Sequence, residues 1–361
     1  MISLWEASMK YVIYHLLLFL FPFSAYSQST QLNQELDTYI DQVITEYGVP
    51  GIALAVIKDG TTVHKQNYGF ANIEHEAPVK DHSIFRLYSL TKPIIAVGMF
   101  SLIEQGKLSL EDPISTYVAG LPNTWHKVQI KHLLTHSSGL PSMSGNTPYE
   151  VQDLTEEQAK ERVFVMDIIS QPGQQYDYDR TNFWLLKEII EKVTSMPMQE
   201  FILNHQFPSS TNDSIFFSSD SREIFKHRAT PYFPFLKGHM TIDLPYVLGD
   251  YSDASNGLNS TIDQLIQWDD AMRKNELISE ATKLDMWKPF AYTQSDQISA
   301  YGWGIYEMNG KTAYGFSGSL STMYVTIPEA DLSIIYLSNG FANWYRLNSV
   351  INDIVTISMN N

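Results

Sequence analysis

Strand-like segments gather near both ends of this chain, and helical patterns fill the region between them. Near the start, an apolar run from Gly51 to Ile57, the turn Lys58-Asp59-Gly60 and a run from Val63 to Tyr68 predict a β-hairpin. Near the end, four more strands are predicted, at 301–306, 312–316, 323–327 and 332–337. The sequence therefore predicts an α+β fold: an α/β sandwich lobe with one antiparallel sheet, and a mostly helical lobe inserted into it.

Helical periodicity marks the rest of the domain. Apolar residues recur at helical spacing from Thr30 to Tyr47, where Gly48 and Pro50 end the pattern. Further helices are predicted at 93–105, 130–135, 182–193, 261–272 and about 344–357, with an irregular loop at 208–234. We expect one domain over 28–361, with the sheet lobe at about 28–88 and 291–361 and the helical lobe at about 89–290.

Composition excludes several functions. With 40 acidic and 24 basic residues, the formal net charge is -16, which would repel a phosphate backbone, so nucleic acid is not an expected partner. The chain has 0 cysteines, so disulfides, thiolate metal sites and cysteine nucleophiles are excluded. Any chemistry must use oxygen and nitrogen groups.

The N-terminus is typical of a signal peptide. Lys10 precedes an apolar run from Tyr11 to Phe23, and small residues at Ala25 and Ser27 suit cleavage between Ser27 and Gln28. An uncleaved membrane anchor is the alternative, but the run is short for a bilayer span. We expect residues 1–27 to be removed, leaving a periplasmic or secreted protein with no stable membrane span.

The first candidate for chemistry is Ser89-Leu90-Thr91-Lys92, followed by an apolar helical run. Residues three apart share a helix face, so the Lys92 amine would lie beside the Ser89 hydroxyl. Burial in apolar surroundings would lower the lysine pKa and make Lys92 a base for a serine nucleophile. Taken alone the motif is weak, because a helix cap followed by a solvated lysine is the common structural explanation.

Motifs around this pair occur in a fixed order. They lie at Phe85–Pro93, at Ile130–Pro141, from Pro172-Gly173 through Asn182, at Gly257–Thr261 and at Tyr301–Gly304. In these segments the chain resembles the serine β-lactamase and penicillin-binding-protein superfamily, specifically its class C β-lactamase-related group of serine hydrolases, which also holds esterases and D-amino-acid peptidases.

The resemblance implies a second motif, Tyr-x-Asn, whose place is taken by Tyr178-Asp179-Arg180. Tyr178 would inherit the family tyrosine's proton relay, with phenolate character favoured by Lys92 and Arg180. A register slip of two residues would give that role to Tyr176. Arg180 cannot accept a hydrogen bond as asparagine can, and it is a candidate for binding an anionic substrate group.

The third motif, usually Lys-Thr-Gly or His-x-Gly, corresponds to Phe316-Ser317-Gly318, followed by Ser319. Gly318 would let the substrate backbone approach the strand, and the amides of Ser89 and Ser319 would form the oxyanion hole. Because Phe316 replaces a cationic or imidazole group, an uncharged ester or amide suits this surface better than a β-lactam carboxylate.

Three functions follow from these residues. The leading hypothesis is a serine hydrolase that acts through an acyl-enzyme on an ester, amide or peptide and needs no cofactor. The second is a degenerate penicillin-binding-like protein that binds peptide or cell-wall fragments. The third is a β-lactamase or D,D-carboxypeptidase, with Arg180 supplying the missing positive charge. A metal at His132 and His136, spaced i, i+4, is not expected because no third ligand is apparent. The sequence leaves the oligomeric state open.

Overall fold

The fold is taken from a computed structural model. It describes residues 30–143, 154–211, 213–220, 222–234, 240–242, 249–319, 322–340 and 344–361. The predicted signal peptide, residues 1–27, and its cleavage site lie outside these ranges. Within them, no helix combines the length and apolar character that crossing a bilayer requires.

One seven-stranded antiparallel sheet unites the two ends of the chain, in the order β3-β2-β1-β12-β11-β10-β9. Its strands are β1 (Gly51–Lys58), β2 (Thr61–Asn72), β3 (Ala77–Pro78), β9 (Gly304–Met308), β10 (Lys311–Gly318), β11 (Thr322–Ile327) and β12 (Leu332–Ser338). The two ends meet at the centre of the sheet, where β1 pairs with β12 from Ile52↔Ser338 to Lys58↔Leu332. The predicted α+β fold, with one antiparallel sheet built from distant segments, is confirmed.

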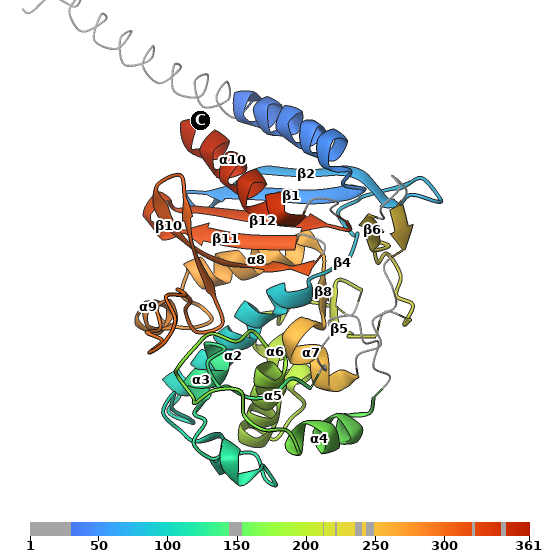
Figure 1. Ribbon diagram of the computed structural model, residues 1–361. Helices are drawn as coiled ribbons and strands as arrows, with labels where there is room; N and C mark the ends of the chain where they lie inside the picture. The colour runs from blue at the N-terminus through green and yellow to red at the C-terminus, as the bar shows by residue number, and fades with distance from the viewer. Residues whose placement is uncertain are drawn as a thin grey trace, which may run out of the picture.

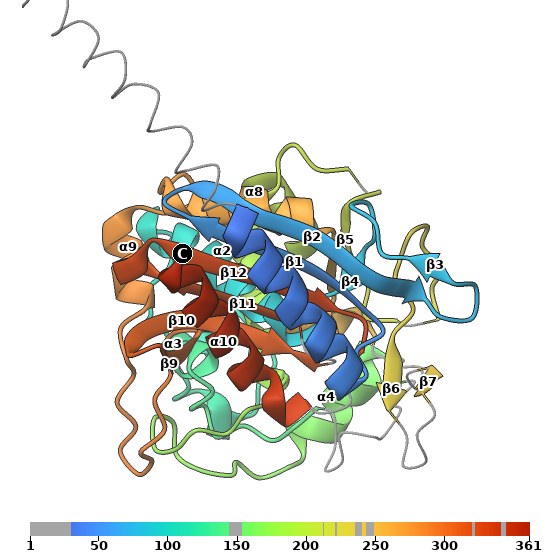
Figure 2. The same ribbon diagram turned by 90° about the horizontal axis from the view of Figure 1, so that it is seen from above.

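Side-chain alternation in β1 gives the sheet two buried faces. Ile52, Leu54 and Val56 pack with the helix over residues 30–47 and with α10 (Leu347–Asn360), which lie side by side above the sheet in Figures 1 and 2. The intervening Ala53, Ala55 and Ile57 belong to the core on the opposite face. Since each fully buried Val, Leu or Ile side chain contributes about 1.5–3 kcal/mol, both helical layers hold the sheet firmly.

Eight helices of the described chain lie between the two groups of strands. They are α2 (Thr91–Glu104), α3 (Ile130–Leu134), α4 (Glu156–Phe164), α5 (Thr181–Thr194), α6 (Met198–Gln206), α7 (Asp253–Asn256), α8 (Ile262–Arg273) and α9 (Glu280–Met286). Helix α8 covers β1 and β12, and most of the others lie below the sheet in Figure 1. Helix α2 occupies the centre, since every residue from Thr91 to Leu102 is buried.

Two small sheets were not foreseen. The strands β4 (Phe85–Arg86), β8 (Leu258–Ser260) and β5 (Ile215–Phe217) form one, and β6 (Tyr232–Pro234) pairs with β7 (Met240–Ile242) in the other. The prediction of an unbroken irregular loop at 208–234 is therefore wrong at β5 and β6. Strand β4 matters for function because it leads directly into the segment that carries Ser89.

Candidate active site

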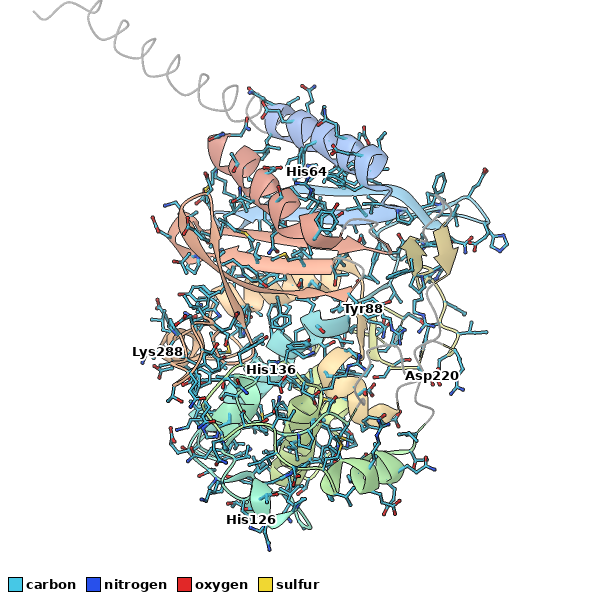
Figure 3. The ribbon with its side chains drawn as sticks, viewed as in Figure 1. His64, Tyr88, His126, His136, Asp220 and Lys288 are labelled. Carbon is cyan, nitrogen blue, oxygen red and sulfur yellow. The ribbon has the colours of Figure 1, made fainter. Side chains whose placement is uncertain are left out.

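The nucleophile segment joins β4 to α2 through the 3-10 turn η1 (Tyr88–Leu90). Tyr88, which Figure 3 places between the sheet and the helices below it, has φ +50. A left-handed backbone at such a bulky residue costs about 1–3 kcal/mol and persists only where its surroundings fix it. The chain is held on both sides of Tyr88. Before it, the Leu87 amide donates to the Leu258 carbonyl at 2.9 Å, and after it, helix α2 begins at Thr91. The strained turn therefore holds Ser89 at a defined position.

Lys92 stands one helical turn from Ser89, as its spacing predicts. Its Nζ lies 3.2 Å from Ser89 Oγ and donates to the Ser255 carbonyl at 2.7 Å. Only 1% of Lys92 is exposed, and its Nζ lies 4.8 Å from the ring centroid of Tyr178. Burial, followed by the positive charge of Arg180, holds the Lys92 pKa well below its usual value, against a weaker opposite effect of Asp179. This amine is suited to accept a proton.

Tyr178 reaches the same serine from an irregular loop before α5. Its hydroxyl donates to Ser89 Oγ at 2.6 Å, and its ring stacks on Phe316 with centroids 6.4 Å apart. Although 41% of the residue's surface is exposed, desolvation dominates and raises the Tyr178 pKa to about 12, against the lowering effects of the Ser89 hydrogen bond and Arg180. The raised pKa opposes the predicted phenolate character, although Arg180 lowers the Tyr178 pKa as predicted. Tyr176 instead packs on Tyr292, at 6.0 Å.

The third motif ends strand β10 beside the nucleophile segment. A Cβ on Gly318 would lie 2.1 Å from the Leu87 carbonyl oxygen and 2.4 Å from Thr322 Oγ1. Glycine is therefore required for packing against the nucleophile segment, which is a different reason from the predicted approach of substrate. Ser317 forms a hydrogen bond with Tyr306, and Ser319 follows the strand at an exposed position. The pairing of the Ser89 and Ser319 amides as an oxyanion hole stays a prediction.

Arg180 lies at the N-cap of α5, half-buried. Its charge lowers the pKa values of both Lys92 and Tyr178. Within the described part of the chain, its side chain forms no hydrogen bond or ion pair. Its role as an anion-binding residue stays a prediction.

The two histidines of the 130–141 motif do not share a helix face. Helix α3 ends at Leu134, and His136 has φ +52. His132 Nδ1 accepts a hydrogen bond from the Gln129 amide at 3.1 Å, and burial, followed by the charge of Lys131, lowers the His132 pKa to about 4. Among the residues that the structure describes, no group of three or more potential ligands could hold a metal ion.

A lysine and a tyrosine thus converge on one serine in this site. The beta-lactamase family model matches residues 36–349, which is most of the chain. The chain belongs to the beta-lactamase family. Penicillin-binding protein 4* of Bacillus subtilis (strain 168) is 28% identical over 327 residues, which cover 85% of this chain and 71% of that protein.

Solved structures of beta-lactamase-like proteins have the same fold. The octameric penicillin-binding protein homologue from Pyrococcus abyssi has a TM-score of 0.77 and 26% identity, covering 91% of this chain and 77% of that one. D-amino acid amidase from Ochrobactrum anthropi SV3, complexed with D-phenylalanine, has a TM-score of 0.76 and 18% identity, covering 92% of this chain and 99% of that one. The predicted superfamily is confirmed.

Three contributors to this beta-lactamase-like site were missed from sequence. The Ser255 carbonyl holds Lys92, the Phe183 ring lies 5.3 Å from Lys92 Nζ, and His136 packs behind Tyr178. The Ser255 contact is made by a backbone carbonyl, so the residue type gives no indication of it. The family motif at 130–141 did contain His136, but its left-handed backbone cannot be read from residue type.

Proposed function

We propose that this protein is a serine hydrolase that cleaves an ester or amide through an acyl-enzyme on Ser89. One observation carries the proposal: Lys92 Nζ and Tyr178 Oη approach the same Ser89 Oγ, at 3.2 and 2.6 Å. A buried neutral amine and a protonated phenol supply a base and an acid to one hydroxyl. The beta-lactamase family relationship supports this chemistry.

The proposed reaction begins with Lys92. Its neutral amine takes the proton of the Ser89 hydroxyl as Oγ attacks the substrate carbonyl, and the amides of Ser89 and Ser319 bind the resulting oxyanion. When the tetrahedral intermediate collapses, Tyr178 gives its proton to the leaving group and regains one from the ammonium of Lys92. A water molecule then attacks the ester on Ser89, and the same groups move its protons in reverse to release the acid.

The substrate class follows from the surface beside Ser89. Phe316, on β10, stacks on Tyr178, so an aromatic pair lies beside the reacting groups. Such a surface suits an apolar acyl or leaving group. The similarly folded amidase was solved with D-phenylalanine, which agrees with an aromatic small molecule as substrate. We also propose export by the signal peptide, with activity in the periplasm or outside the cell.

The test uses the full mature protein and a fluorophosphonate, which labels an activated serine whatever the substrate. Intact mass should show one adduct, mapped to Ser89, and p-nitrophenyl butyrate should be turned over steadily. Ser89→Ala should abolish both results, whereas Ser209→Ala, at an exposed serine elsewhere, should leave them unchanged. No adduct on the wild-type protein would overturn the proposal and favour a non-catalytic, penicillin-binding-like role.

A second candidate rests on Arg180. Its guanidinium lies near Lys92 and Tyr178 and has no ion-pair partner in the described chain, so it could bind the carboxylate of a β-lactam or a D-alanyl peptide. Nitrocefin turnover that exceeds ester turnover, and that Arg180→Gln removes, would establish this activity in place of the first. Absence of nitrocefin turnover, or nitrocefin turnover that Arg180→Gln leaves unchanged, would exclude this role of Arg180.

A further inference from the structure

One residue holds the chain on both sides of Tyr178. The amide of Asp177 donates to the His136 carbonyl at 2.7 Å, and the amide of Asp179 donates to His136 Nδ1 at 3.3 Å. These are the two amides that flank Tyr178 in the chain. Next to this contact, the Gly173 amide donates to the Ser137 carbonyl at 2.7 Å. The irregular loop is thus fixed to the 136–137 backbone at the point where it presents its tyrosine.

The imidazole of His136 also supports the Tyr178 ring. The two ring centroids are 4.5 Å apart, and Phe183 lies on His136 at 5.4 Å. Only 3% of His136 is exposed, and Figure 3 places it between the sheet and the helices below. A ring so enclosed restricts the directions in which Tyr178 can turn.

Hydrogen bonding determines which nitrogen of His136 carries the proton. Asn182 Oδ1 accepts from the Ser138 hydroxyl at 2.6 Å, so its Nδ2 faces His136 Nδ1, at 3.2 Å. Nδ1 therefore accepts from two donors and must keep its lone pair. We therefore assign the proton to Nε2, which has no hydrogen-bond partner among the described residues. Burial lowers the His136 pKa well below its usual value, which agrees with this assignment.

The left-handed backbone allows this double contact. At φ +52, His136 directs its carbonyl and its ring nitrogen to the same loop. Among side chains with a Cβ, asparagine tolerates such a backbone best, and its Oδ1 is attached at the same position as Nδ1 of histidine. Leucine has a similar size there but offers no acceptor.

We propose that His136 is the positioning residue that sets the Tyr178 hydroxyl against Ser89. It acts through both flanking amides and through its ring, without touching the substrate. This inference rests on the proposed function, since Tyr178 has a proton to move only if Ser89 is acylated. It assigns to the 130–141 motif a role in the geometry of the reaction.

The experiment measures how fast a fluorophosphonate labels Ser89 in the mature protein, in a double-mutant cycle. His136→Leu should slow labelling about tenfold or more, because small misplacements of a reacting group have effects of this size. In a Tyr178→Phe background, the same substitution should slow labelling less than about twofold, since there is no hydroxyl left to position. Equal slowing in both backgrounds would overturn the proposal.

A second variant covers the possibility that His136→Leu does not fold. His136→Asn keeps the acceptor and tolerates the left-handed backbone, so it should label within about threefold of the wild-type rate. His205→Asn removes another half-buried imidazole, on α6, and should leave the rate unchanged. A folded His136→Asn that labels as slowly as Tyr178→Phe would contradict the role of the acceptor. If wild-type Ser89 is not labelled at all, the proposed function fails first, so the two failures are distinguishable.

Discussion

The two halves of the candidate site are built differently. Ser89 and Lys92 come from one short segment, where a strained turn runs into the fully buried start of α2. Tyr178 comes from an irregular loop that is fixed by residues about 40 positions earlier in the chain. Local geometry sets the distance between Ser89 and Lys92, whereas tertiary contacts set the position of Tyr178. Sequence spacing alone can therefore predict the serine and lysine distance but not the position of the tyrosine.

The pKa shifts in the two halves of the site have the same main cause, which is burial. Burial lowers the Lys92 pKa and raises that of Tyr178, because it penalises whichever form carries charge. Arg180 acts with burial on the lysine and against it on the tyrosine. Burial thus favours the neutral form of both groups beside the same hydroxyl. The predictions below compare the segment of Ser89 and Lys92 with the loop of Tyr178.

The largest effect is expected from removing the helix-borne base. Lys92→Met should lower the rate of ester hydrolysis about 10²–10⁴-fold, because among the described residues Lys92 alone brings an amine within hydrogen-bond distance of Ser89 Oγ. Stopped or steady-state assays with p-nitrophenyl butyrate would measure it. Lys288→Met, at an exposed lysine labelled in Figure 3, is the matched control and should retain full activity. A Lys92→Met enzyme with more than a tenth of the wild-type rate would show that the base lies elsewhere.

Removing the loop-borne acid should cost less. Tyr178→Phe keeps the ring stacked between His136 and Phe316 but loses the hydroxyl, and we expect a loss of about 10–10²-fold in kcat. Esters with a good leaving group need little proton donation, so p-nitrophenyl esters should be affected less than alkyl esters. Equal losses on both ester types would argue against proton transfer to the leaving group.

The pH dependence separates the two groups without mutation. Lys92 is active when deprotonated, so the labelling rate should fall about tenfold per pH unit below the Lys92 pKa, which lies below 10.5. Tyr178, with its pKa raised to about 12, stays protonated and should produce no second transition below about pH 10. Fluorophosphonate labelling from pH 5 to 10 would measure the profile. A falling limb near neutral pH would assign a different acid.

The smallest effect is expected at the aromatic surface. Phe316→Ala should raise KM for aromatic esters about two- to tenfold, because an aromatic pair contributes about 0.5–1.5 kcal/mol beyond its burial. Acetate esters, which do not reach this surface, should change little in the same assay. If Phe316→Ala instead lowers kcat for acetate esters, Phe316 acts by packing on Tyr178 and not by binding the substrate.

Much of the fold follows from periodicity, and the exceptions have physical reasons. The predicted hairpin, the helices at α2, α5 and α8 and the four late strands agree with the structure to within a few residues. The strands β4, β5 and β8 are two or three residues long, and such segments show no period in sequence. The helices α4, α6, α7 and α9 were also missed.

Part of the candidate site could also be predicted from the sequence, and part could not. The closeness of Ser89 and Lys92 follows from their spacing, whereas Tyr178 was chosen through the family resemblance and its register after Pro172-Gly173. The role of His136 depends on a backbone angle and on a loop that folds back onto it, which residue types do not encode locally. The raised pKa of Tyr178 was not predicted, because desolvation of its hydroxyl depends on the folded chain.

The pairing of β1 with β12 also has a consequence for folding order. The central seam of the sheet joins residues 52–58 to residues 332–338, so its contacts close a loop of nearly the whole domain. Contacts of such long sequence separation form slowly, and here the last strands are also the last to be synthesised. Gly318 packs on the Leu87 carbonyl, so the turn before Ser89 gains its support from the same late segment. The packing around this turn is therefore complete only after β10, which carries Gly318, has been synthesised and has joined the sheet.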